Sequence, residues 1–400
     1  MKPAARSWRS ALVVALLFAI CSIWTAPGLA AQEPASPQAT SAAQLQAAID
    51  KLGSLDYNTR TDASRLVRRT AASQAVPALL SAVAQDADGY VRFRALVLLT
   101  AFNDPRIKDA VRESLSSPND RLRTVAYNFL EHNPDKSMLP DLLAALDKEQ
   151  AEFVRPALIR ALAAHGDDAR AQAVLVREAG RGEDFFRSAV IEALGDYKAK
   201  YAFDALNGIA RLDGPLLDDA ALALGKIGDQ RALGTLAGLQ RSAPRQAQPF
   251  VAAGICLLGT NCEAHEGFLV ETLKFSDQNI GFQELLRGAA SGLGALGVGG
   301  RESSARALFD VGVPSRDPTR APVALAVATI ALRNTPLMLS VLKAAPTNDA
   351  IALLAEGFDM LEEDFDKERF FALVRRTYWE SAEGSANRQL MQILIGKLDF

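Results

Sequence analysis

The chain has 400 residues, of which 49% are hydrophobic, so it has enough apolar side chains for a folded core and is not wholly disordered. Its 44 basic and 47 acidic residues give a formal charge of -3. This composition disfavours nucleic acid or an anionic membrane surface as a partner, because basic residues supply the affinity for both.

The N-terminal segment 1–31 has the pattern of a secretory signal peptide. Three basic residues precede the apolar stretch 11–23, which is too short to span a bilayer comfortably, and the small residues Ala30 and Ala31 follow a Pro-Gly break. We expect cleavage near Ala30/Ala31 and a periplasmic or secreted mature chain without an integral membrane span. The alternatives are an uncleaved anchor and lipidation at Cys21.

An arginine recurs at a nearly constant interval and marks an internal repeat. Apolar residues three, four and seven positions after it form one stripe of an amphipathic helix, and an Asp or Asn about four positions before it suits a helix N-cap. A second helical pattern precedes each such helix, so each unit is predicted to be an outer helix, a short turn and an inner helix. The arginines are Arg60, Arg92, Arg123, Arg155 and Arg187.

The pattern continues with longer steps and then loosens. We predict a disordered tether over residues 32–40, which are rich in Pro, Ala, Ser and Gln, and a repeat array over 41–334. Residues 335–400 are predicted to form atypical helical repeats and a C-terminal cap, because an array must cover its last apolar face.

The stretch 223–232, Ala-Leu-Gly-Lys-Ile-Gly-Asp-Gln-Arg-Ala, resembles the signature of HEAT-like repeats of the phycobilisome-lyase type. Partial copies occupy 192–197 and 293–297. The resemblance extends over about residues 44 to 335. It implies an all-α fold, an α-α superhelix of antiparallel helix pairs, in which the Gly closes the inner helix as a left-handed cap and the Asp starts the next turn.

The resemblance also implies that the regular arginines form a structural Asp–Arg ladder linking adjacent units. Five guanidinium groups in a row repel one another, so carboxylates are expected between them. The alternative is an anion-binding stripe on the concave face. The carboxylates expected in the ladder are Asp56, Asp88, Asp120, Glu152 and Asp184.

The cysteines and histidines offer one weak metal pattern. Cys256, Cys262 and His265 lie close together in the sequence, but a fourth ligand is not evident and the spacing matches no usual zinc frame. In an exported protein we expect Cys256 and Cys262 to pair as a disulfide, with free thiols or a metal site as alternatives. His132 and His165 are expected in exposed turns, with a shared metal as the alternative.

Two charged segments stand out near the C-terminus. The acidic cluster of Asp359, Glu362, Glu363, Asp364 and Asp366 does not supply the ligand spacing of a calcium loop and is interpreted as a solvated helix end. The second segment mixes basic and aromatic side chains, as partner contacts do, although a capping helix would equally explain it. Its residues are Arg375, Arg376, Tyr378 and Trp379.

The sequence contains no Gly-x-Ser-x-Gly elbow, no His-Glu-x-x-His pair and no phosphate-binding loop. We therefore expect no enzyme activity and no cofactor, and a monomeric scaffold or adaptor in the cell envelope that binds a protein partner along its curved helical face. The alternatives are a lyase-like or cofactor-binding enzyme and a purely structural envelope protein.

Overall fold

The computed structural model describes residues 33–212, 214–361 and 363–400. Residues 35–400 form one compact unit. Its described part contains 22 α-helices, four short 3-10 turns and a single isolated bridge as its strand-like pairing. The all-α prediction is confirmed. The predicted signal peptide, residues 1–31, lies outside the described residues.

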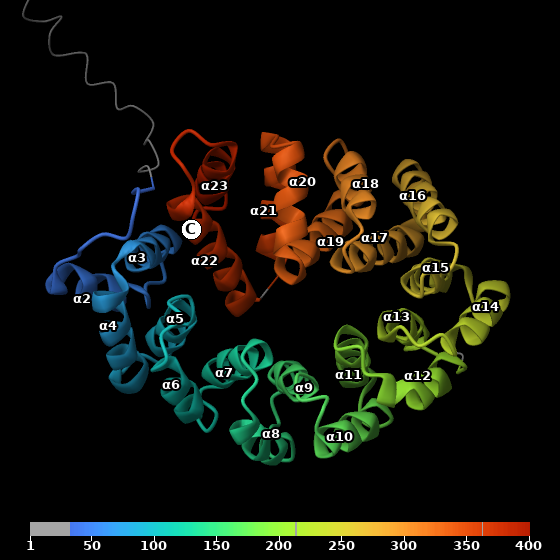
Figure 1. Ribbon diagram of the computed structural model, residues 1–400, viewed down its shortest axis with the longest axis horizontal. Coiled ribbons are helices and arrows are strands. Elements are labelled where there is room, and N and C mark those ends of the chain that lie inside the picture. The colour runs from blue at the N-terminus through green and yellow to red at the C-terminus, as the bar shows by residue number, and fades with distance from the viewer. Residues whose placement is uncertain (1–32, 213, 362) are drawn as a thin grey trace, which may run out of the picture. The chain divides into compact units, whose positions relative to one another are not determined.

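The helices alternate between an outer and an inner layer, as the repeat predicts (Figure 1). The outer helices are α2 (Ala42–Lys51), α4 (Ala72–Gln85), α6 (Ile107–Ser114), α8 (Leu139–Leu146), α10 (Ala169–Ala179), α12 (Phe203–Ala210), α14 (Ala232–Ser242), α16 (Cys262–Gln278), α18 (Glu302–Gly312) and α20 (Thr335–Ala344). The inner helices are α3 (Tyr57–Arg69), α5 (Gly89–Thr100), α7 (Asp120–His132), α9 (Arg155–Ala163), α11 (Asp184–Asp196), α13 (Leu217–Ile227), α15 (Gln248–Leu257), α17 (Gln283–Val298), α19 (Arg320–Arg333) and α21 (Asn348–Met360). The last two helices are α22 (Asp364–Glu380) and α23 (Ala386–Lys397).

Local sequence explains where the inner helices begin and which face they bury. Asp56 and Asp88 each accept a hydrogen bond from a backbone N–H of the first turn, which satisfies a donor that has no partner inside the helix. The residues three, four and seven positions after each regular arginine are buried, as in Ala63, Ser64 and Val67 after Arg60. The predicted apolar stripe is therefore confirmed.

The glycines of the repeat signature have two different roles. Gly228 ends α13 in the left-handed conformation, with φ 68°, as the resemblance implies. Gly225 instead lies inside α13, where an added Cβ would come within 2.5 Å of the Gly254 carbonyl oxygen on α15. Gly195 and Gly297 likewise lie inside helices against a neighbouring helix, so the left-handed-cap prediction is wrong for these copies.

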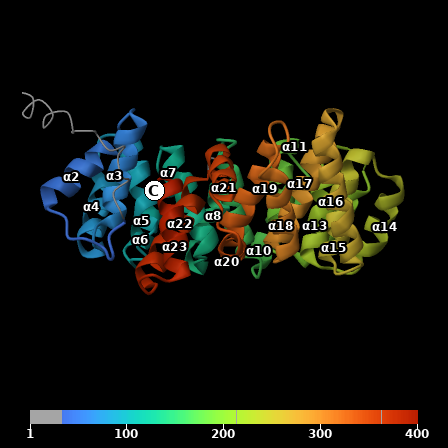
Figure 2. The same cartoon turned by 90° about the horizontal axis from the view of Figure 1, so that it is seen from above.

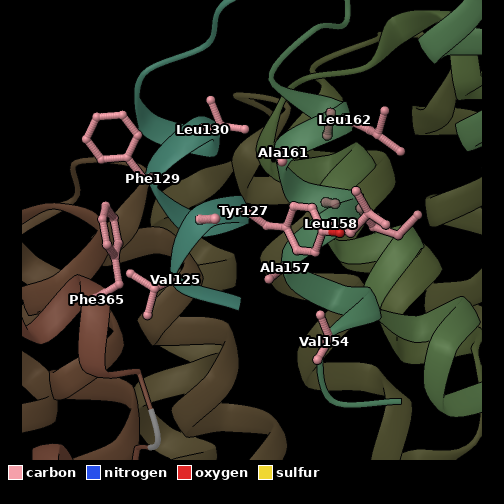
Figure 3. Packing of buried hydrophobic residues seen from close by; sticks show 14 of the residues in the cluster. Val125, Tyr127, Phe129, Leu130, Val154, Ala157, Leu158, Ala161, Leu162 and Phe365 are labelled. Carbon is pink, nitrogen blue, oxygen red and sulfur yellow. The ribbon is translucent and has the colours of Figure 1, made fainter. Parts of the chain in front are cut away.

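The helices curve round until the C-terminal pair meets the N-terminal units (Figure 1). Figures 1 and 2 both place α22 beside α5, and α22 also packs on α7 and α19. Phe365 of α22 joins the apolar core of the first units beside Val125 and Phe129 (Figure 3). The C-terminal helices therefore pack both on the last units of the array and on its first units, and this double contact closes the array into a ring.

The predicted tether is wrong in its second half. Gln38 donates its backbone N–H to the Arg69 carbonyl at 2.7 Å and accepts from the Ala71 N–H at 2.9 Å. The backbone of Thr40 exchanges two hydrogen bonds with the Gln74 side chain. These contacts hold residues 38–40 against the turn between α3 and α4.

By length and apolar composition, none of the described helices taken singly is suited to cross a membrane. One pair of adjacent helices, α19 and α20, meets those criteria jointly, with a bend of 119° between them.

Candidate functional site

The closing seam, where α22 and α23 meet α3 and α5, is held by ion pairs between residues far apart in the sequence. Arg68 on α3 binds both carboxylate oxygens of Glu368 on α22 through its Nε and Nη2 atoms, at 2.6 to 3.0 Å. Both side chains are almost fully buried, with 7% and 2% exposed. Arg94 on α5 pairs with Asp364 at 2.8 Å. The seam is therefore a specific interface rather than a loose contact.

A charged network continues from the seam across the inner face. Its centre is Glu131 on α7, which is 4% exposed and accepts hydrogen bonds from Arg160 at 2.8 Å and from the Tyr197 hydroxyl at 3.0 Å. Arg160 also binds Asp196, which in turn accepts from Lys226 on α13 at 2.7 Å. Buried charges tolerate loss of water only when they are paired in this way.

The same network reaches α19 and α22 on the opposite side of the ring. Arg333 on α19 lies 3.7 Å from Glu131 and 3.5 Å from Asp366 on α22. Burial favours the neutral form of Asp366, but the hydrogen bond to His132 and the charges of Arg333 and Arg369 hold its pKa below the usual range. The interpretation of Asp364 and Asp366 as a solvated helix end is therefore wrong, because both make ion pairs within the ring.

A group of carboxylates on the inner face stands beside this network. Asp218 and Asp219 open α13 and are half-buried, with Glu192 on α11 and Glu284 on α17 close enough to act on them electrostatically. Burial, together with Asp219 and Glu284, raises the pKa of Asp218 to about 6. Half-buried carboxylates that lie close together repel one another when ionised. A cation placed beside them would therefore stabilise their ionised form.

The regular arginines lie at the start of the inner helices and are half-buried. Four of the five donate to a backbone carbonyl in or just beyond the last turn of the preceding outer helix, where such carbonyls lack helical partners. The fifth, Arg155, stacks on the Phe186 ring at 3.7 Å and lies 4.0 Å from Glu178. The four donor–acceptor pairs are Arg60 with Ser54, Arg92 with Val83, Arg123 with Ser117 and Arg187 with Ala179.

Four of the arginines therefore tie their inner helix to the outer helix of the same unit. Arg155, through Glu178 and Phe186, and Arg123, through Glu149, also reach the next unit. The carboxylates expected between units have local roles: Asp56 and Asp88 cap their own helices, and Asp184 pairs with Arg187 of the same helix at 2.9 Å. Sequence reasoning missed two arginines of the same kind, Arg320 and Arg388, which bind the carbonyls that end α18 and α22. The period could have found Arg320, which follows Arg287 at nearly the same interval.

Replacing Arg123 tests this structural role. Arg123 makes a two-pronged pair with Glu149, at 2.7 and 2.9 Å, and Glu149 is 7% exposed. We expect Arg123→Ala to lower the free energy of unfolding by about 1–3 kcal/mol, because a buried carboxylate loses its partner. Urea unfolding would measure it, with the exposed Arg241→Ala as control. An unchanged stability would contradict the structural role.

The same pair predicts a pH dependence. The hydrogen bond from Arg123 lowers the pKa of Glu149 below its usual 4.5. A lowered folded-state pKa stabilises the protein above the unfolded-state pKa, and this stabilisation is lost as the pH falls through the lowered value. The deficit of Arg123→Ala should therefore be largest near neutral pH and shrink in acid.

Residues 76–163 match the model of HEAT repeats. Residues 76–163 therefore carry HEAT repeats. The match covers the units from α4 to α9, and the same outer–inner alternation continues through α21. A HEAT array of this kind presents an extended inner surface, a form typical of protein-interaction scaffolds.

No curated protein matches this sequence significantly. Many solved structures resemble the chain at low identity, among them the following three. The Escherichia coli protein YibA is 16% identical over 55% of this chain and 82% of its own, with TM-score 0.41. The complex of CpcE and CpcF of phycocyanin lyase from Nostoc is 20% identical over 82% and 96%, with TM-score 0.28. Importin beta is 12% identical over 89% and 59%, with TM-score 0.38. At these values they carry no information on what this chain binds.

The cysteines of the HEAT array form a disulfide between Cys256 and Cys262, with their Cα atoms 4.1 Å apart. Within the described ranges, no group of three or more His, Cys, Asp or Glu side chains is arranged to hold a metal ion.

The histidines expected in exposed turns are both placed differently. His165 is 1% exposed, and burial lowers its pKa. His132 is the last residue of α7, and its half-buried side chain contacts Asp366 at 3.1 Å. The expectation is therefore wrong for both residues.

Of the four C-terminal residues expected to contact a partner, two are buried in the structure and two are accessible. Arg375 and Tyr378 are each 2% exposed, and Arg375 donates to the Phe400 carbonyl at 2.7 Å, so both belong to the packing of α22. Arg376 is exposed and Trp379 is half-buried. These two keep accessible surface that a partner can contact.

Proposed function

We propose that this chain is a non-catalytic scaffold or adaptor of the cell envelope that binds a protein partner on its inner face. The observation that carries the proposal is the unbroken stacking of inner helices from α7 to α21, which makes one preformed surface. A preformed surface binds with little ordering cost, so many shallow contacts can add up to useful affinity.

Two features support the finer parts of the proposal. The signal-peptide pattern of the segment 1–31 favours export, and the disulfide between Cys256 and Cys262 suits an oxidising compartment. The carboxylates around Asp218 outnumber the nearby cation Lys226, so this part of the inner face carries negative charge that a basic region of a partner would neutralise.

The test is a crosslinking capture from envelope extract with the chain from Gln32 onward. We expect one dominant protein partner, and we expect the double variant Asp218→Lys with Asp219→Lys to lose it, because it reverses the charge of the inner face. Asp204→Lys on the outer helix α12 changes the charge in the same direction, by half as much, and should keep the partner.

Folding of each variant is checked by circular dichroism and thermal unfolding. A milder pair, Asp218→Asn with Asp219→Asn, keeps the test valid if the lysine variant unfolds. Failure of well-folded wild-type protein to capture any partner would overturn the scaffold proposal. Equal loss in the Asp204→Lys control would overturn the inner face as the binding surface.

A further inference from the structure

Two adjoining pockets run along the closing seam, on the side of α22 that faces the turns after α5 and α7. Their volumes are about 400 and 320 Å³, and they share four lining residues, so they form one continuous groove. We name it the seam groove. The shared residues are Ala101, Asn103, Ala372 and Arg376.

The walls of the seam groove combine aromatic surface with exposed amides. Phe102 and Trp379 line the first pocket, and Phe129 and Phe365 line the second. Asn103 and Asn133, both exposed, stand at the turns; the Asn133 amide donates to the Phe129 carbonyl and keeps its oxygen as an acceptor, and Asn103 offers an amide group for hydrogen bonds to a peptide backbone. Apolar walls with a few polar groups are the usual composition of a binding pocket.

The seam groove presents exposed positive charge although the whole chain is acidic. Of the four arginines that line it, Arg68 is bound to Glu368 and Arg375 is buried, so the exposed charge is that of Arg369 and Arg376. Arg369 is 42% exposed and forms an ion pair with Asp366, the same carboxylate that lies near Arg333 in the network of the inner face. Arg376 is exposed, and its guanidinium makes no ion pair or hydrogen bond with any described part of the chain. The four arginines are Arg68, Arg369, Arg375 and Arg376.

We propose that the seam groove binds an acidic peptide segment that carries aromatic side chains, with Arg376 and Arg369 as the anchors of its carboxylates. This deepens the proposed scaffold function and rests on it, since the segment would belong to a protein partner. Arginine binds carboxylates with two parallel hydrogen bonds, and the aromatic walls would hold the ring of the ligand. Charge complementarity therefore favours this occupant over a basic one.

The groove exists only in the closed ring. Ala101 and Asn103 follow α5 near the start of the array, whereas Ala372 and Arg376 belong to α22 near its end. A ligand that binds the closed form and not the open one stabilises closure by mass action. Binding should therefore raise the midpoint of thermal unfolding.

The experiment measures fluorescence anisotropy of a fluorescein-labelled peptide, acetyl-Asp-Phe-Asp-Trp-Asp-amide, with the full chain from Gln32 onward. The matched probe replaces each Asp of the peptide by Lys. We expect binding of the acidic probe only, and at least about tenfold weaker binding by Arg376→Glu, since a charge-assisted hydrogen bond is lost. Arg241→Glu, an exposed arginine on α14, should bind like wild type.

Equal binding of the acidic and basic probes, or no effect of Arg376→Glu, would overturn the proposal. Binding of anionic phosphatidylserine vesicles that Arg376→Glu abolishes, without binding of the peptide, would overturn it in favour of a lipid surface. If envelope extract yields a partner equally with wild type and with Arg376→Glu, the seam groove fails while the scaffold function stands. The capture experiment on wild type alone decides the scaffold function.

Discussion

Glu368→Ala is expected to lower the free energy of unfolding by about 3–5 kcal/mol, because it leaves the Arg68 guanidinium buried without its carboxylate. The loss falls on the contact of α22 with α3 and α5 that helps to close the ring, so the first effect should be separation of these helices. Urea unfolding would measure the energy. Small-angle X-ray scattering would show the opening as a larger radius of gyration.

Two variants make this expectation falsifiable. Arg306→Ala removes an ion pair with Glu302 whose side chains are 55% and 42% exposed, and it should change stability by no more than about 1 kcal/mol. The double change Arg68→Met with Glu368→Leu replaces the buried pair by apolar groups and should recover most of the loss. If Glu368→Ala behaves like Arg306→Ala, the seam contributes little to stability.

The repeat could be predicted from sequence because its information is local. In each of the first three units, the N-cap, the arginine and the apolar stripe lie within one helical segment, as in Asp88, Arg92 and Leu96. The later helices, including α18 and α21, also lie in segments whose apolar residues recur with helical spacing. Hydrophobic periodicity therefore sufficed for the order and layering of the helices.

The closing seam could not be predicted, because no unit encodes which distant unit it will meet. Asp364 and Asp366 looked like ordinary charges at a helix end, yet their partners Arg94 and His132 lie far earlier in the chain. One signal was present in α22: Glu368 and Arg375 occupy positions on the buried face of an otherwise amphipathic helix. Such buried charges indicate partners elsewhere in the chain.

Gly225→Ala should destabilise the array, although glycine-to-alanine changes inside helices usually stabilise. The new Cβ would meet the backbone of Gly254 on α15, with the carbonyl oxygen at 2.5 Å and the carbonyl carbon at 2.8 Å. Backbone atoms cannot turn aside as a flexible side chain can, so α13 and α15 must separate. We expect a loss of about 1–3 kcal/mol, the usual cost of overpacking, measured by urea unfolding.

Gly238→Ala is the matched control. Gly238 lies inside the outer helix α14, and a Cβ added there would have nothing within 4 Å. The change should stabilise the protein by about 0.5–1 kcal/mol, because alanine loses less backbone freedom on forming a helix. Opposite signs for the two variants would show that α13 and α15 approach too closely to accept a side chain at position 225. Equal stabilisation would mean that α13 and α15 have room to spare.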